Sequence, residues 1–369
     1  MQLLFKTTQC RFFRPVSDND VARYFGEMRD GISQARCGHR DKLSCDVLHD
    51  GIRYCRKKVA QVAVEKGKQT VDPSRKALAP RLYAILARSA RTGVIFRRGP
   101  SRLVQLIRWD LRTDTFEHGQ WLKGRVYERR CDLSPSGELL VYFAATNRPP
   151  YASWTAISKP PFFTALTFWP KGDAWGGGGV FEDENKLLLN HPFDDNRVSL
   201  APGFRLKRGM QVDPCGILSG RGEDEPISGY ILARDGWRVI DAGEGQTNGL
   251  KASTFYSFNK PRVLQKPGAN GRRLQMVLHS IGRSQKAWYG LDYRVYDRDG
   301  TLLVDLPETD WADWDGGDLV FARGGCLYRL AKSDFRSGNV MPIEFSSRLH
   351  DFNGAGFTAL APPHAARHY

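Results

Sequence analysis

The chain has 369 residues, of which 41% are hydrophobic and 26% charged, and this ordinary balance excludes a wholly disordered chain, a collagen repeat and a coiled coil. Glycine is in excess at 37 residues, with nine tryptophans and 20 phenylalanines, which favours many short strands joined by tight turns. The formal net charge of +15 raises the odds of an acidic partner.

The first 80 residues differ from the rest in composition. They contain no tryptophan, and residues 1–90 hold 18 Lys and Arg against 9 Asp and Glu. Apolar residues recur at helical spacing in 21–32, after the cap candidates Ser17 and Asp18, and in 52–62. We expect residues 1–80 to be a basic N-terminal extension, partly helical or disordered, that adds little to the core; whether it belongs to the natural protein stays open. The alternative is a nucleic-acid or acidic-partner contact through the basic helix face formed by Arg53, Arg56, Lys57 and Lys58.

The seven cysteines do not form a disulfide pattern, because their number is odd and the chain is long. Cys37, His39, Cys45 and Cys55 have spacings that match no zinc finger, so we expect no metal. No apolar signal region follows residues 1–5, and no run of 18 apolar residues occurs. These features predict a cytoplasmic protein with reduced thiols and no membrane contact.

After an expected linker at 81–92, the pattern becomes one of strands. Leu103–Asp110, Phe116–Leu122, Arg125–Leu133 and Glu138–Ala144 read as one sheet, with a type I turn at Ser134–Gly137. Further strands are expected at Trp154–Ser158, Phe162–Trp169, Leu187–Asn190, Gly229–Ala233 and Trp237–Asp241.

The last third of the chain repeats the pattern. Strands are expected at Tyr293–Asp297, Thr301–Leu306, Trp311–Asp315, Asp318–Ala322 and Cys326–Ala331. Strands at this spacing predict an all-β domain over 93–361, with a C-terminal tail at 362–369. We expect Phe352–Leu360 to pair with the strands near Val94–Arg98 and so to close the domain.

Two stretches resemble blade motifs of the WD40 and TolB-type β-propellers. Cys131–Ala144 (CDLSPSGELLVYFA) has the strand, the turn and the second strand, with Ser136 where those families usually have Asp, and Trp311–Leu330 is similar with Gly-Gly turns. Arg97–Asp110 (RRGPSRLVQLIRWD) is similar to uncharacterised bacterial proteins of this propeller-like type. The resemblance implies a small propeller-like domain of about four to five antiparallel sheets and implies no activity.

The stretch FWPKGDAWGGGGVFEDE is the strongest candidate for a ligand site. Glycine permits close approach of the backbone to a ligand, and tryptophan rings can stack on sugars or bases. The candidate ligand-binding residues are Trp169, Trp175, Gly176, Gly177, Gly178 and Gly179. Asp173 and Glu182 form the carboxylate pair of an alternative, glycan-hydrolysing function. A flexible hairpin with packed tryptophans and a solvated acidic turn explains the same residues without a ligand.

No other motif specifies a reaction. The glycine run lacks the Lys-Ser/Thr of a phosphate loop, and the chain has no G-x-S-x-G turn. Cys131, Cys215 and Cys326 are expected to be buried and inert, and His279 to be a core residue. Arginines between Arg97 and Arg130 could bind nucleic acid, but acidic residues alternate with them, which favours cross-strand pairs. We therefore expect a non-enzymatic protein-interaction module of a bacterial multi-protein system, without a cofactor.

Overall fold

We analysed a computed structural model of the chain, which describes residues 78–99, 102–192, 199–220, 222, 225–249, 252–284, 287–335 and 340–369. The second of the chain's two units begins at residue 77 and contains all of them. The expectations for residues 1–77, including the basic helix face with Arg53, Arg56, Lys57 and Lys58, lie outside the described residues.

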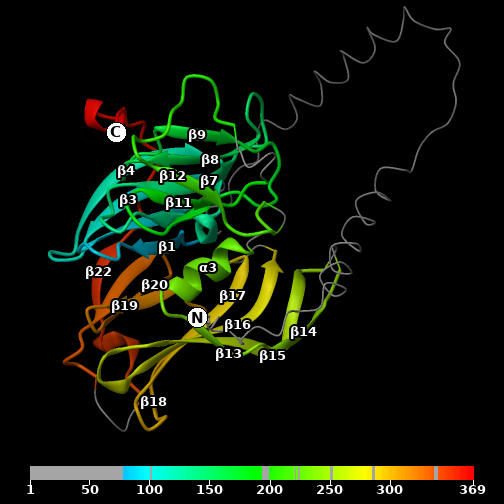
Figure 1. The fold of residues 1–369 in the computed structure, drawn as a ribbon. Helices are drawn as coiled ribbons and strands as arrows, with labels where there is room; N and C mark the ends of the chain where they lie inside the picture. The colour runs from blue at the N-terminus through cyan, green and yellow to red at the C-terminus, as the bar shows by residue number, and fades with distance from the viewer. Residues whose placement is uncertain are drawn as a thin grey trace, which may run out of the picture. The chain divides into compact units, whose positions relative to one another are not determined.

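The described chain is built from five small sheets that follow one another in sequence (Figure 1). Sheet 1 contains β1 (Arg81–Leu86), β2 (Thr92–Arg98), β3 (Leu103–Asp110) and β4 (Thr115–Lys123). Sheet 2 contains β5 (Arg125–Val126), β6 (Asp132–Leu133), β7 (Leu140–Ala145), β8 (Ser153–Ser158) and β9 (Thr167–Pro170). Sheet 3 contains β10 (Gly179–Phe181), β11 (Lys186–Leu189) and β12 (Gln211–Pro214).

Sheets 4 and 5 complete the series. Sheet 4 contains β13 (Arg238–Asp241), β14 (Glu244–Thr247), β15 (Thr254–Pro267), β16 (Arg273–Arg283), β17 (Tyr289–Tyr296) and β18 (Leu302–Leu306). Sheet 5 contains β19 (Trp311–Asp315), β20 (Asp318–Arg323), β21 (Cys326–Leu330) and β22 (Ser347–Asp351). Neighbouring strands are antiparallel, except that β12 runs parallel to β11.

Helical structure is sparse among the described residues. The helix α3 covers Ile227–Arg234. Single 3-10 turns occur at η1 (Glu128–Arg130), η2 (Ala269–Gly271), η3 (Ile343–Phe345) and η4 (His364–Ala366).

Alternating residues of one strand face two different sheets. On β2, Val94 and Phe96 pack in a cluster with sheet 2, whereas Ile95 packs in a cluster with sheet 5. On β20, Leu319 and Phe321 face sheet 4. The alternating residues Val320 and Ala322 face sheet 1. Because side chains alternate across a strand, a continuous apolar strand is what a sheet covered on both faces requires.

The same alternation orders the other sheets. On β7, Leu140 and Tyr142 face sheet 1, and Val141 packs against Phe181 and Leu187 of sheet 3. The packing order is therefore sheet 4, sheet 5, sheet 1, sheet 2 and sheet 3. This arrangement confirms the expected all-β, propeller-like domain of four to five sheets, with five.

The helix α3 fills the place between sheets 3 and 4 (Figure 1). Its residues Ile227 and Ile231 pack against Val180 of β10, and Leu232 packs against the core of sheets 4 and 5. The expectation of a strand at Gly229–Ala233 is wrong. Ile227 and Ile231 lie one turn apart on the helix face that meets sheet 3, and the adjacent Leu232 lies on another face, which meets the core of sheets 4 and 5.

Closure between the last and first sheets comes from side chains and not from strand pairing. Phe352–Leu360 forms no strand, which corrects the expectation that it pairs with Val94–Arg98. Instead, Arg97 donates a hydrogen bond from Nε to the carbonyl of Phe352 at 2.8 Å, and the Phe352 ring packs with Trp109. The tail then passes β4, where Gln120 Nε2 donates to Leu360, and reaches sheet 2, where Lys159 donates to Ala365.

Two further boundaries differ from the sequence prediction. The segment 81–92 is not a linker, because it contains β1, whose alternate residues are buried. Arg125–Leu133 is not one strand but β5, the turn η1 and β6, which places Glu128 and Arg129 in the turn between two strands of sheet 2. The two halves of the expected 103–144 sheet consequently belong to sheets 1 and 2.

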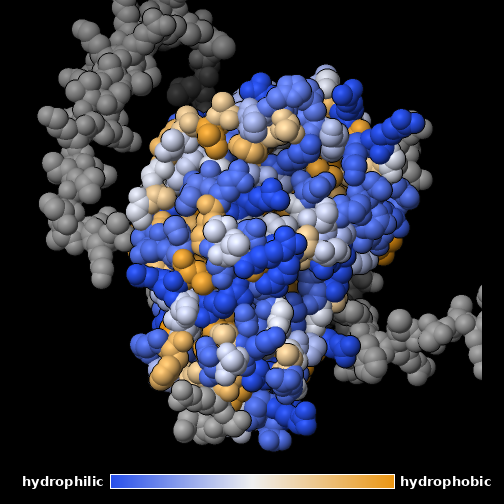
Figure 2. All heavy atoms as spheres, turned by 90° about the vertical axis from the view of Figure 1, so that its left-hand side faces the viewer, coloured by the Kyte–Doolittle hydropathy of each residue, from blue (hydrophilic) through white to orange (hydrophobic). Residues whose placement is uncertain are grey.

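The side of the domain near β4 and β22 is mainly hydrophilic, with apolar residues in small separate groups (Figure 2). Among the described residues, no helix has the length and hydrophobicity needed to span a membrane.

Candidate functional site

A cavity of about 40 Å³ lies where four of the five sheets meet. The first strand of sheet 1, β1, contacts β6 of sheet 2 and β19 of sheet 5, so its residues lie near the centre. The cavity is lined by residues from sheets 1, 2, 4 and 5: Arg81, Leu82, Tyr83, Phe96, Arg98, Glu128, Arg129, Ala287, Trp288, Tyr289, Leu291 and Asp310. We call it the central cavity.

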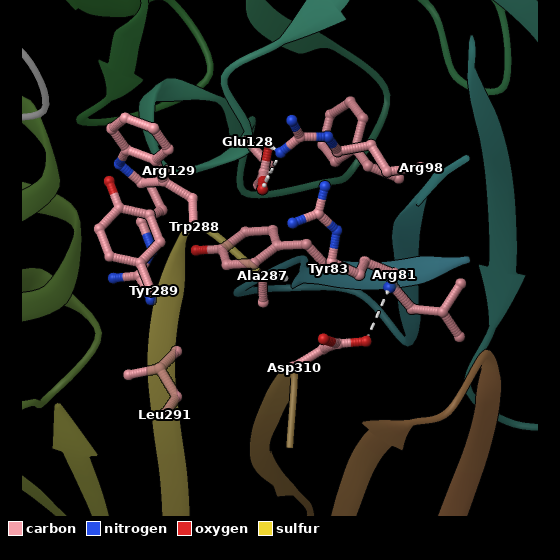
Figure 3. A pocket seen from close by; sticks show the side chains of 12 residues that line it. Arg81, Tyr83, Arg98, Glu128, Arg129, Ala287, Trp288, Tyr289, Leu291 and Asp310 are labelled. Atoms are coloured by element: carbon pink, nitrogen blue, oxygen red, sulfur yellow. Dashed lines mark hydrogen bonds and ion pairs between the residues drawn. The ribbon is translucent and has the colours of Figure 1, made fainter. Parts of the chain in front are cut away.

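The polar side chains of the central cavity are held by specific contacts (Figure 3). Arg98 donates from one nitrogen to both carboxylate oxygens of Glu128, at 3.0 and 3.2 Å. The backbone N–H of Leu82 donates to Asp310 at 3.3 Å. Figure 3 shows Arg81 pointing toward the Arg98–Glu128 pair and the Tyr83 ring pointing toward Tyr289.

Electrostatics makes the cavity a cationic one. Burial opposes the charge of Glu128, but Arg98, a backbone hydrogen bond, Arg125 and Arg81 hold the pKa of this carboxyl below its usual value. Burial raises the pKa of Asp310 to about 7, despite the Leu82 N–H and Arg81. Three guanidinium groups therefore face one firmly charged carboxylate and one that is partly neutral at pH 7.

Aromatic rings support the arginines from sheets 2 and 4. The guanidinium carbon of Arg129 lies 4.0 Å from the centre of the Tyr289 ring. That of Arg125 lies 4.4 Å from Tyr127 and 5.3 Å from Trp288. Burial raises the pKa of the Tyr83 phenol, which therefore stays protonated and can donate a hydrogen bond. The lining is rich in donors, as an anion site requires.

Asp310→Asn is expected to stabilise the protein at pH 8 by about 1–3 kcal/mol and to change little at pH 4. In the unfolded chain, Asp310 loses its proton as the pH rises above the ordinary pKa near 3.8. In the folded protein, the raised pKa lets Asp310 keep that proton up to about pH 7. The folded state is therefore stable with protonated Asp310 at low pH, and it loses free energy of unfolding as the pH rises from about 4 to 7. Asparagine cannot ionise and still accepts from Leu82. Urea unfolding at both pH values measures the difference, and an equal or lower stability of the variant at pH 8 contradicts this account.

The glycine run has a packing role in the structure. Gly176, Gly177 and Gly178 have φ values of +63°, +86° and +83°, which side chains rarely adopt. A Cβ at Gly177 would lie 2.3 Å from the ring of Phe143, and one at Gly179 would lie 2.9 Å from the carbonyl of Leu188. Protein atoms therefore occupy the space that a ligand would need beside this backbone.

Buried polar groups fix the same run. Gly178 N–H donates to the Thr155 hydroxyl at 2.8 Å, and that hydroxyl bonds His191 Nε2 at 2.8 Å. Asn190 Nδ2 donates to the carbonyl of Gly177 at 3.1 Å, and Arg130 donates to that of Gly176 at 2.6 Å. Burial lowers the pKa of His191 to about 3, so this histidine stays neutral.

The other residues of the sequence-predicted site differ in burial and in their partners. Trp169 is 2% exposed and packs between sheets 2 and 3, whereas Trp175 is 36% exposed. Asp173 pairs with Lys171 at 2.7 Å, and Glu182 pairs with Lys186 at 2.7 Å. Neither carboxylate lines the central cavity.

The remaining candidates take structural positions. Cys131, Cys215 and Cys326 are buried free thiols, and burial raises the pKa of Cys215 to about 11. His279 is not a core residue: its side chain is 40% exposed, and Nε2 bonds Asp292 at 2.7 Å.

The arginines between Arg97 and Arg130 do not form one basic surface. Arg97 and Arg130 are buried, and Arg108 lies opposite Glu117 across β3 and β4. Only Arg98 and Arg129 of this group line the central cavity.

A second cavity, of about 300 Å³, lies beside sheet 4. It is lined by Asn270, Arg272, Asp297, Arg298, Asp299, Leu303 and Phe335. These residues come from turns of sheet 4, from its strand β18 and from the segment after β21, whereas four sheets contribute to the central cavity.

Comparison with known proteins adds no family. No known family and no curated protein matches the chain. Among solved structures, an uncharacterized protein of Listeria monocytogenes EGD-e has a TM-score of 0.26 at 9% identity, over 74% of this chain and 84% of that one. Hydrazine synthase of Kuenenia stuttgartiensis has a TM-score of 0.27 at 9% identity, with the same shares. The β-propeller domain of the Trilobed protease from Pyrococcus furiosus has a TM-score of 0.24 at 10% identity, over 77% of this chain and all of that one.

Proposed function

We propose that the chain is a non-enzymatic protein-interaction module of propeller type, acting in a bacterial multi-protein system, and that it binds its partner at the mouth of the central cavity. One observation carries the proposal: side chains of four sheets converge on a small cavity that is rich in donors. A face built from several sheets offers a partner many separate contacts.

Arg129→Glu is expected to reduce recovery of the partner at least tenfold, because it reverses a charge at the mouth of the cavity. The measurement is affinity purification of the tagged full chain from its native host, with quantitative mass spectrometry of the proteins that copurify. Arg348→Glu is the matched control, since Arg348 is an exposed arginine of β22, 3.9 Å from Asp351, and does not line the cavity. Equal recovery with Arg129→Glu and the wild type would contradict the proposal.

A further inference from the structure

The donors of the central cavity exceed what its own carboxylates use. Arg98 is occupied by Glu128, whereas Arg129 stacks on Tyr289 and forms no ion pair with any described residue. A guanidinium group stacked over a ring keeps its N–H groups in its own plane, at the edge of the stack, where they can meet an incoming acceptor. The cavity can therefore accept at least one further negative charge.

Size limits what can enter. The volume of about 40 Å³ compares with the 10–15 Å³ that one water molecule needs, so the cavity holds about three water-sized groups. A carboxylate has three heavy atoms, whereas a sugar ring or a nucleobase is several times larger. The cavity thus fits the end of a side chain rather than a whole metabolite.

The cavity can be reached from solvent. The side chains of Arg98 and Glu128 are 20% and 18% exposed. Trp288 and Tyr289 are also partly exposed and stand beside the arginines (Figure 3). Their rings give the backbone or the stem of an acidic side chain an apolar surface to pack on, which a free inorganic anion does not use.

We propose that the central cavity binds a carboxylate group of an acidic peptide segment, held by Arg129 and flanked by Trp288 and Tyr289. This inference rests on the proposed function, because the segment belongs to the protein partner. Glu128 stays paired with Arg98 during binding, and the incoming carboxylate replaces solvent at the guanidinium group of Arg129.

The test is calorimetric titration of the full chain with two peptides, Ac-Glu-Glu-Glu-NH2 and Ac-Gln-Gln-Gln-NH2, and with inorganic phosphate. We expect the Glu peptide to bind at least tenfold more tightly than the Gln peptide. Raising NaCl from 25 to 250 mM should weaken the Glu peptide severalfold, since partly exposed charges are screened. Arg129→Gln should lower its affinity about tenfold, and Arg348→Gln should leave it unchanged. Equal affinities for the two peptides, or binding of phosphate without the Glu peptide, would overturn the inference.

The outcomes separate this inference from the proposed function. If Arg129→Glu abolishes partner recovery while the Glu and Gln peptides bind equally, the proposed protein-interaction function is supported. The inference that the cavity binds a carboxylate is then wrong. If the Glu peptide binds selectively while Arg129→Glu leaves recovery unchanged, the site stands and the protein-interaction role falls. The salt titration uses the wild-type chain, so it remains decisive even where a variant fails to fold.

Discussion

Gly178→Ala is expected to destabilise the protein by more than about 4 kcal/mol, enough to prevent folding at 37 °C. A Cβ at this position would lie 2.0 Å from the carbonyl oxygen of Arg130, and the backbone φ is +83°. That carbonyl belongs to η1, the turn that places Glu128 and Arg129 at the central cavity. The backbone therefore cannot move aside without disturbing the cavity.

Gly172→Ala is the matched control for this substitution. Its φ of +89° is nearly the same, but no atom lies within 4 Å of the position of its Cβ. We expect a cost of only about 1 kcal/mol, from the left-handed backbone alone. Melting temperatures followed by circular dichroism compare the two variants. If Gly178→Ala melts like Gly172→Ala, the glycine run is not a packing element, and the original hypothesis of a ligand site there regains support.

The sequence predicted a strand correctly where apolar residues on both of its faces give a continuous apolar run. Leu103–Asp110 forms β3 with the expected bounds. Val104 and Leu106 pack with sheet 2, and Ile107 and Trp109 pack with sheet 5. The segment with α3 failed for a physical reason. It has only eight helical residues, and Gly229 together with β-branched Ile227 and Ile231 weakens the local helix propensity. The helix is stabilised by packing against sheets 3 and 4, because its intrinsic helix propensity is weak.

The central cavity could not be predicted from the sequence. Its residues lie between Arg81 and Asp310 and belong to four sheets, so no local motif contains them. Arg97 and Arg98 show the difficulty: they are neighbours in sequence, yet Arg97 binds the carbonyl of Phe352 and Arg98 binds Glu128. Alternation along β2 sends them to opposite faces, and sequence alone does not say which sheet covers each face. The glycine run was noticed correctly, but its positive φ values support packing as readily as ligand binding.

The junction of sheets 5 and 1 contains a partly buried network of ion pairs centred on Arg329. From β21, Arg329 donates to Asp114 of sheet 1 at 2.8 and 3.0 Å. It also donates to Asp315 at 2.8 Å and to Asp318 at 3.0 Å. Arg91 of sheet 1 binds Asp315 from the other side. Although burial opposes its charge, the hydrogen bonds with Asp114 and Asp315 raise the pKa of Arg329.

Arg329→Met is expected to cost about 3–5 kcal/mol, because it leaves three carboxylates together with Arg91 as the only remaining basic partner among the described residues. For a domain of this size, the melting temperature should fall by about 5–15 °C. Arg348→Met, on the neighbouring strand β22, is the control, since an exposed pair is worth under about 1 kcal/mol.

A double-mutant cycle with Asp114→Asn tests whether the loss comes from the junction itself. Because Arg329 and Asp114 lie on different sheets, their coupling energy measures an interaction that acts only when sheets 5 and 1 are in contact. We expect a coupling of about 1–3 kcal/mol. Additive losses, or a melting temperature of Arg329→Met within about 1 °C of the wild type, would mean that the apolar contacts around Trp109 and Phe352 hold the junction without the charges.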